Sequence, residues 1–174
     1  LISFLRDEKM SDKMIAITRY SATDYLATLA IDSVHPKYDV YRVQINDVNI
    51  RLKMLLNNEM DAVLLSEPQA TRARLEGHVK LMDSRDKNVR LGVFAFRTEA
   101  LKEPRRKQQL DLFIKAYNMA VDSINKNGVQ HYKDLIIQNC GADARTDDAL
   151  PKLRYQHAGS PRKHDRNIAN SIKN

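Results

Sequence analysis

Residues 14–30 read MIAITRYSATDYLATLA, and this stretch decides the fold. The apolar run over 14–18 predicts a buried strand. Ser21 follows as an N-cap candidate, with Asp24 three residues later as an acidic variant of the capping box, so a helix is predicted to begin directly after the strand. Such a helix directs unpaired backbone N–H groups at the edge of a sheet, which is a suitable place for an anionic or polar small molecule.

Two further strand-and-helix units follow the first. Apolar patterning predicts strands over 14–18, 38–43, 61–65, 79–82 and 89–97. The third of these strands is nearly all apolar, so we expect helices to cover both of its faces. Strands that alternate with helices at this spacing are typical of βαβ units. We therefore predict an α/β fold with a mainly parallel sheet of about five strands and flanking helices.

Polar residues that follow the strands are suited to start the helices. Asn46-Asp47 can cap a second helix, which Asn57-Asn58 ends. The buried side of this helix is predicted to consist of apolar residues, namely Ile50, Leu52, Met54, Leu55 and Leu56. Glu67-Pro68 opens a third helix, with proline in a first-turn position, and Gly77 closes it.

The chain changes character after Pro104. Helical periodicity predicts a long amphipathic helix that ends near Gly128, with an apolar face formed by Leu110, Phe113, Ile114, Tyr117, Val121 and Ile124. Shorter helices are predicted over 132–139 and from about Pro161. No strand is evident after Arg97, so this half is a helical tail that needs another surface to bury its apolar faces.

Charge and aromatic content argue against a nucleic-acid partner. The net charge is +7 and the pI is near 9.5, but the basic residues are spread along the chain. The seven tyrosines and four phenylalanines form no stacking array interleaved with those basic residues. We therefore expect no nucleic acid among the partners.

The sequence lacks the motifs of catalytic and metal sites. Cys140 is the only cysteine, which excludes an intrachain disulfide and a thiolate zinc site. The five histidines have no HExxH or other metal-ligand spacing, and there is no GxGxxG motif, Walker loop or GxSxG elbow. We expect no catalytic residue, no metal and no cofactor, and we interpret the chain as a binding protein. No run of about 18 apolar residues exists, so we predict at most a peripheral association with a membrane.

Three passages resemble the type II periplasmic solute-binding proteins of ABC importers. The branch in question includes nitrate, sulfonate, taurine and thiamine-precursor binders. The passages are RYSAT (19–23) after the first strand, LLNNEMDAVLLSEP (55–68), and GVFAFR (92–97) with FIKAYNMA (113–120). The second passage is the most specific, because it is similar to a run of leucine, asparagine, glutamate, aspartate, alanine and proline in that family.

The resemblance implies a two-lobed clamp with a small-molecule ligand between the lobes. Residues 11–91 would form one α/β ligand-binding lobe. Residues 92–174 would supply a return strand and a helical segment that packs on a first lobe, so that the sequence corresponds to the carboxyl-terminal part of a longer protein. The implied partner is an importer permease, and the implied location is periplasmic or lipid-anchored at the cell surface.

The candidate ligand-binding residues follow the first three strands. They are Tyr20, Ser21, Ala22, Thr23, Asn46 and Glu67. Each has a structural alternative: Ser21 and Asn46 as plain N-caps, Tyr20 as a residue that closes the turn, and Glu67 as an acidic residue at the positive end of its own helix.

Two other functions are compatible with the same resemblance. The first is an enzyme of the thiamine-pyrimidine-synthesis type, which would need a reactive histidine or a metal site in the cleft. The second is the effector-sensing domain of a transcription regulator, which would need a DNA-binding segment outside this sequence.

Overall fold

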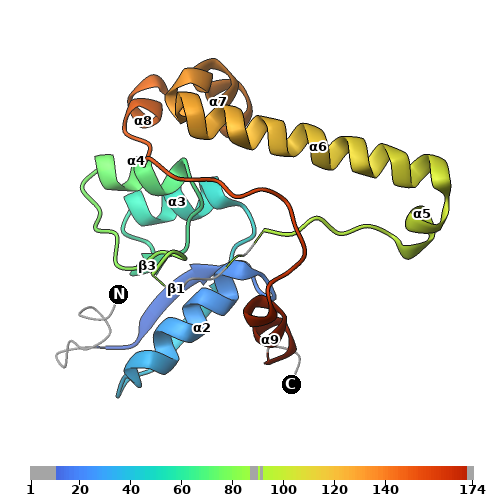
Figure 1. Cartoon of the computed structure of the whole chain (residues 1–174). Helices are drawn as coiled ribbons and strands as arrows, with labels where there is room; N and C mark the ends of the chain where they lie inside the picture. The colour runs from blue at the N-terminus through green and yellow to red at the C-terminus, as the bar shows by residue number, and fades with distance from the viewer. Residues whose placement is uncertain (1–10, 87–89, 91, 172–174) are drawn as a thin grey trace.

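The computed structural model describes residues 11–86, 90 and 92–171, and its first half is an α/β unit (Figure 1). The elements are β1 (Lys13–Ile17), α2 (Ala22–Val34), β2 (Val40–Gln44), α3 (Val48–Leu56), β3 (Ala62–Val63) and α4 (Gln69–Leu75). The three strands form a parallel sheet in the order β2-β1-β3. The α/β class, the parallel pairing and the first three predicted strands are therefore confirmed.

The core of this unit lies between β1 and α2. Ile15 and Ile17 are fully buried on the central strand and pack with Ala27 and Ala30 of α2 and with Ala62 of β3. Small alanines on the helix let it approach the sheet closely. Figure 1 shows α2 on one side of the sheet and α3 with α4 on the other. That arrangement follows when one right-handed crossover runs from β1 out to β2 and the next runs back past β1 to β3, in the opposite direction across the sheet.

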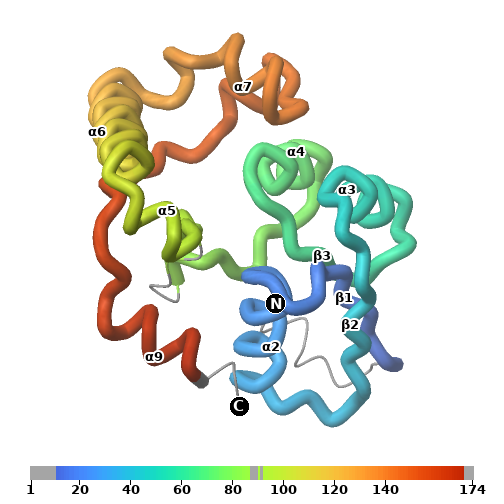
Figure 2. Tube along the Cα trace, turned by 90° about the vertical axis from the view of Figure 1, so that its right-hand side faces the viewer, coloured from blue at the N-terminus to red at the C-terminus, as the bar shows by residue number. Residues whose placement is uncertain are grey.

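The second half of the described chain is helical. Its elements are α5 (Thr98–Lys102), α6 (Pro104–Asn127), a 3₁₀ turn (Val129–Tyr132), α7 (Lys133–Cys140), α8 (Ala144–Asp148) and α9 (Lys163–Ser171). The long helix α6 extends away from the sheet as an arm, and Figure 2 shows it nearly end-on beside the α/β unit. The predicted long helix that ends at Gly128 is confirmed, because Gly128 is the C-cap of α6.

The prediction of about five strands is wrong for the described residues, in which the sheet has three. Residues 79–82 form no strand, and Val79 and Leu81 remain exposed. Residues 92–97 also form no strand; residues 89 and 91 of that predicted strand lie outside the described residues. Within 92–97, Phe94 packs on a helix and not in a sheet, because its ring lies edge-on against Phe113 and Tyr117 of α6.

An extended segment before α9 runs along α6. The side-chain amide of Asn125 bonds both the N–H and the carbonyl of Tyr155, each at 2.9 Å. Asn118 Oδ1 accepts from the N–H of Ala158 at 2.9 Å, and Asp122 contacts His157 at 2.7 Å. Asn118, Asp122 and Asn125 lie on one face of α6, so their side chains hold the extended segment along the helix.

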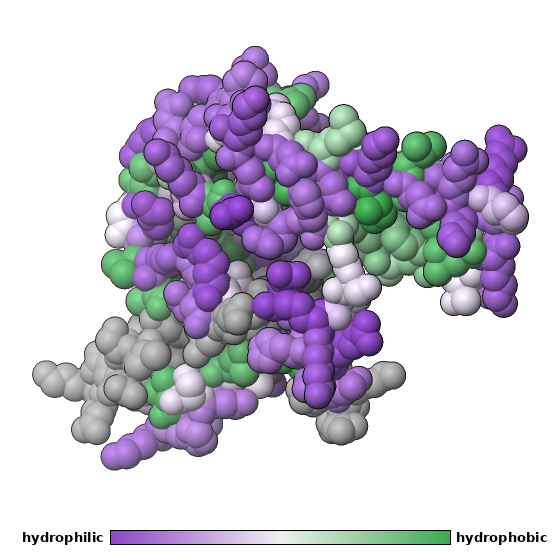
Figure 3. Space-filling model, in the orientation of Figure 1, coloured by the Kyte–Doolittle hydropathy of each residue, from purple (hydrophilic) through white to green (hydrophobic). Residues whose placement is uncertain are grey.

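Apolar side chains remain exposed along the arm. They are Leu112, Phe113 and Met119 of α6, together with Val93, Phe96 and Leu101 before it. Figure 3 shows hydrophobic surface along this part of the molecule. None of the helices within the described ranges combines the length and the apolar character that crossing a bilayer requires.

Candidate functional site

All three strands end at one edge of the sheet, which we call the carboxyl edge. The chain passes from β1 outward to β2 and then returns across β1 to β3, so the strand order reverses between β1 and β3. In open parallel sheets, ligands bind in the crevice at such a reversal, beyond the carboxyl ends of the strands. The segments that meet there are residues 18–23 after β1, 45–47 after β2 and 64–67 after β3.

The turn after β1 is a closed hydrogen-bond network. Ser21 Oγ donates to the carbonyl of Thr18 at 2.6 Å and accepts from the N–H of Thr23 at 3.1 Å. Thr23 Oγ1 in turn accepts from the N–H of Thr18 at 2.9 Å. Ser21 is therefore the N-cap of α2, as predicted. Both hydroxyl groups are occupied within the turn, whereas the N–H of Ala22 has no partner among the described residues.

Tyr20 occupies the tip of this turn. Its backbone is left-handed, with φ of 58°, and its N–H donates to the Asp24 carboxylate at 2.8 Å. The side chain is 93% exposed, with the Arg19 guanidinium 5.7 Å from the ring centroid. In a standard capping box the acidic side chain accepts from the N–H of the N-cap residue. Asp24 accepts instead from the N–H of Tyr20, one residue before the N-cap Ser21. Tyr20 closes the turn in this structure.

Arg51 connects the ends of all three strands. Its Nη1 atom donates to Thr18 Oγ1 at 2.7 Å and to the carbonyl of Ile45 at 2.6 Å. Its Nε atom donates to the carbonyl of Leu64 at 2.9 Å. The residue is only 4% exposed although it carries a charge. The guanidinium therefore lies inside the carboxyl edge and holds β1, β2 and β3 together there.

The charge of Arg51 is not neutralised by a direct partner. Among the described residues no carboxylate forms an ion pair with it. Burial lowers the pKa of the Arg51 guanidinium below its usual value, and the carboxylate of Asp47 acts in the opposite direction. Asp47 is itself occupied, since its Oδ1 caps α3 by accepting from the N–H groups of Asn49 and Ile50.

The predicted residues after β2 and β3 also have structural contacts. Asn46 is exposed and its Oδ1 accepts from Gln44 Nε2 at 3.4 Å; the cap of α3 is Asp47 and not Asn46. Glu67 is exposed and its Oε2 accepts from the N–H of Thr71 at 3.0 Å, at the start of α4. The structure thus brings all three predicted segments to one edge, and gives Glu67 a capping contact there.

Arg51 and Thr18 are absent from the candidate residues predicted from the sequence. Ile50 is predicted on the buried side of α3 but is 51% exposed, whereas Arg51 is buried. The first turn of α3 faces the carbonyl groups at the strand ends. Buried carbonyl groups require hydrogen-bond donors, which an apolar side chain lacks. An arginine four residues after the cap Asp47, within an otherwise apolar helix face, was the signal available in the sequence.

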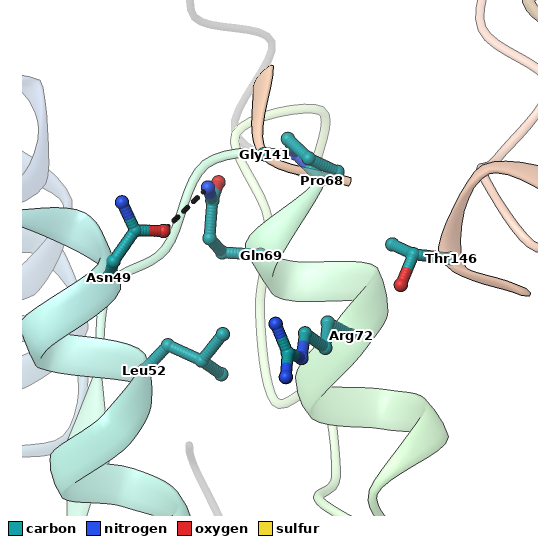
Figure 4. A pocket seen from close by; sticks show the side chains of 7 residues that line it. All are labelled: Asn49, Leu52, Pro68, Gln69, Arg72, Gly141 and Thr146. Atoms are coloured by element: carbon teal, nitrogen blue, oxygen red, sulfur yellow. Dashed lines mark hydrogen bonds between the residues drawn. The ribbon is translucent and has the colours of Figure 1, made fainter. Parts of the chain in front are cut away.

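A small pocket lies between α3, α4 and the segment around α8 (Figure 4). Gln69 is buried there and donates to Asn49 Oδ1 at 3.0 Å. The space amounts to 10 Å³, which is about the room that one water molecule needs. Within the described ranges no group of three or more His, Cys, Asp or Glu side chains could hold a metal ion.

We compared the chain with known proteins by sequence and by structure. It matches no family model, no curated protein and no solved structure at a significant level. The geometry of the carboxyl edge therefore carries the functional interpretation.

Proposed function

We propose that this chain binds a small polar or anionic organic molecule at the carboxyl edge, as the solute-binding component of an ABC-type importer. The observation that carries the proposal is the strand order β2-β1-β3, which puts the reversal point beside the N-terminus of α2. Backbone donors at a helix start favour negative charge, and the buried Arg51 adds a cation at the same edge.

The proposal divides the chain into a ligand-binding lobe over 11–91 and a segment over 92–174 that packs on a first lobe. The exposed apolar residues of the arm support this division. Leu112 is 60% exposed, Phe113 46% and Met119 63%, so α6 has unburied surface for another body to cover. The ligand would then be held between the two lobes, and a membrane permease would receive it.

Such a protein changes no bond in its ligand. Its work is a difference in affinity between open and closed states of the clamp. The turn of residues 18–23 suits that task because its hydroxyl groups are held in one geometry before a solute arrives. The N–H of Ala22, which has no partner among the described residues, is one backbone donor for a hydrogen bond to the solute.

Thermal unfolding in the presence of separate solutes tests the proposal. Sulfonates, pyrimidines and amino-acid-like compounds are added one at a time at constant ionic strength. A solute at 100 times its Kd should stabilise the chain by about 2.7 kcal/mol, which raises Tm by several degrees. Hydrogen exchange should then show protection of the backbone amides over 18–24. No stabilisation by any member of the three classes would refute the proposal.

A further inference from the structure

The far end of the arm carries side chains that the rest of the described chain leaves exposed. Figure 1 shows α5 and the start of α6 at the end of the arm that points away from the sheet. Residues 101–109 are all exposed, and so are Phe96 and Arg97 just before α5. We call this surface the tip patch, and its members are Phe96, Arg97, Leu101, Lys102, Arg105 and Lys107.

The tip patch has a local excess of positive charge. Residues 102–107 read KEPRRK, so four of these six residues are basic. Two acidic residues lie close to them, Glu99 in α5 and Glu103, and Glu103 pairs with Arg106 at 2.6 Å. The four cations of the tip patch itself form no ion pair within the described ranges. Their charges therefore remain for a partner outside the chain.

The basic residues lie at the unfavourable end of their own helix. α6 begins at Pro104, and Arg105 and Lys107 belong to its first turn. Positive charge in this position opposes the positive end of the helix dipole, where an acidic residue would be favourable. The N-cap Glu103 makes no side-chain hydrogen bond that would offset the effect. The stability of α6 thus does not account for these cations, whereas an anionic partner would be favourable for the cations and for the dipole.

Apolar side chains lie next to the cations. Phe96 is 41% exposed and Leu101 is 49% exposed, and Figure 3 shows hydrophobic and hydrophilic residues side by side at this end of the molecule. Phenylalanine and leucine beside lysine and arginine are typical of segments that enter the interface of an anionic bilayer. A group of at least four Lys or Arg residues on such a segment is typical of anionic-lipid binding. Single-stranded nucleic acid would favour several stacking aromatics, whereas the tip patch has one.

We propose that the tip patch docks on an anionic lipid bilayer, with Phe96 and Leu101 entering the interface and the four cations facing the lipid phosphates. The lobe proposed above would cover Leu112, Phe113 and Met119, which follow the tip patch along α6, so the two contacts involve different residues. The inference does not depend on a solute. Because charge attraction and apolar insertion act together, binding should require anionic lipid and weaken as salt is added.

Vesicle flotation of the full chain tests the charge attraction. The vesicles contain phosphatidylcholine alone or phosphatidylcholine mixed with phosphatidylglycerol, and binding is measured at low and at high salt. The triple variant Lys102→Gln, Arg105→Gln and Lys107→Gln should bind the mixed vesicles roughly 100-fold more weakly than the wild-type chain, since each cation near the surface contributes about fivefold. We expect no binding to phosphatidylcholine alone. Equal binding to the two kinds of vesicle would overturn the inference.

A second triple variant provides the matched control. Lys53→Gln, Arg74→Gln and Lys152→Gln remove the same charge from exposed positions outside the tip patch. Binding to the mixed vesicles should change less than about threefold, because attraction to the membrane falls off within a Debye length of its surface. An equal loss in the two triple variants would show attraction by net charge alone and would refute docking through the tip patch.

Tryptophan fluorescence tests the insertion, because the chain contains no tryptophan of its own. Leu101→Trp places a single tryptophan in the tip patch, and Tyr41→Trp places one on β2, where Tyr41 is 52% exposed. Mixed vesicles should shift the emission of Leu101→Trp to shorter wavelength and leave that of Tyr41→Trp unchanged. No shift for Leu101→Trp, or the same shift for both variants, would contradict insertion at the tip.

Another anionic partner would give a different outcome. If the chain binds a duplex oligonucleotide or polyglutamate through the three substituted cations and binds neither kind of vesicle, the tip patch serves another polyanion and the inference is refuted. These results leave the solute site untouched, because the unfolding experiment above tests that site separately. Vesicle binding and solute binding can therefore each fail without the other.

Discussion

The Nη1 atom of Arg51 lies 2.7 Å from the hydroxyl oxygen of Thr18, across 33 residues of sequence. The two residues belong to the first turn of α3 and to the end of β1, and a third contact extends the link to Leu64 at the end of β3. A charged side chain thus occupies the position where an apolar residue would ordinarily close the edge of a small sheet. The same group holds the strand ends together and lies at the candidate site.

Replacing Arg51 should destabilise the chain strongly. Arg51→Met leaves Thr18 Oγ1 and the carbonyls of Ile45 and Leu64 without their donor, and each buried acceptor costs about 1–3 kcal/mol. We expect a loss of at least about 3 kcal/mol in urea unfolding. Lys53→Met, at an exposed position of the same helix, is the control and should change the unfolding free energy by less than about 0.5 kcal/mol. Similar effects of the two substitutions would contradict the structural role of Arg51.

The cap of α2 should be worth about 1 kcal/mol. Ser21→Ala removes the acceptor for the N–H of Thr23 and the donor to the carbonyl of Thr18. Ser33→Ala is the matched control, because Ser33 Oγ bonds only the carbonyl of Ala30 within the same helix. Chemical unfolding of both variants measures the difference. A loss in Ser33→Ala as large as that in Ser21→Ala would mean that the cap has no special role.

Asp147 should be a destabilising residue. It is fully buried in α8, and neither carboxylate oxygen has a hydrogen-bond partner among the described residues. Asp147→Asn removes the buried charge and should raise the unfolding free energy by about 1 kcal/mol or more. The adjacent Asp148 is exposed and pairs with Lys133 at 2.9 Å, so Asp148→Asn should cost at most about 0.5 kcal/mol. Calorimetric Tm values of the two variants should therefore move in opposite directions.

The extended segment before α9 should detach when its amide contact is removed. Asn125→Ala deletes both bonds to the backbone of Tyr155, so the amide of Tyr155 should exchange with solvent at least about tenfold faster. Asn139→Ala serves as control, because the Asn139 amide bonds only the carbonyl of Leu135 on its own helix. Unchanged exchange at Tyr155 would show that α6 does not hold the segment.

The turn at Asp83 should weaken in acid. A hydrogen bond from the Arg85 side chain, with a further one from Lys80 at 2.7 Å, holds the pKa of the Asp83 carboxyl well below its usual 3.8. Because the folded pKa is depressed, the contribution is complete above about pH 4 and is lost as the pH falls below that value. Asp83→Asn should lower stability at pH 7 by about 0.5 kcal/mol, since Arg85 is largely exposed. The difference between wild type and variant should shrink on acid titration; a constant difference would contradict this assignment.

The sequence was most predictive where local chemistry decides the structure. The apolar run of β1, the Ser21 cap and the Gly128 end of α6 are short-range signals, and all three occur as predicted. The strands predicted over 79–82 and 89–97 depended on a partner strand, which a periodic pattern does not specify; residues 89 and 91 lie outside the described residues. Phe94 shows the alternative, because its ring packs on α6 and not in a sheet.

The candidate site was predictable in position but not in chemistry. Parallel strands that precede capped helices imply that their polar ends meet at one edge, and residues 18–23, 45–47 and 64–67 do meet there. The identity of the central residue was not predictable, since Arg51 reaches the edge through contacts with segments 6, 13 and 33 residues away. A helical pattern shows which residues share a face but not which carbonyl groups lie opposite.

Those sequence separations have a consequence for the folding pathway. The guanidinium can lose its water only when β1, β2 and β3 are all in place, because each supplies one of its acceptors. We therefore expect its contacts to form late in folding, once the three strands are assembled. Substitution of Arg51 should then leave the refolding rate nearly unchanged and increase the unfolding rate.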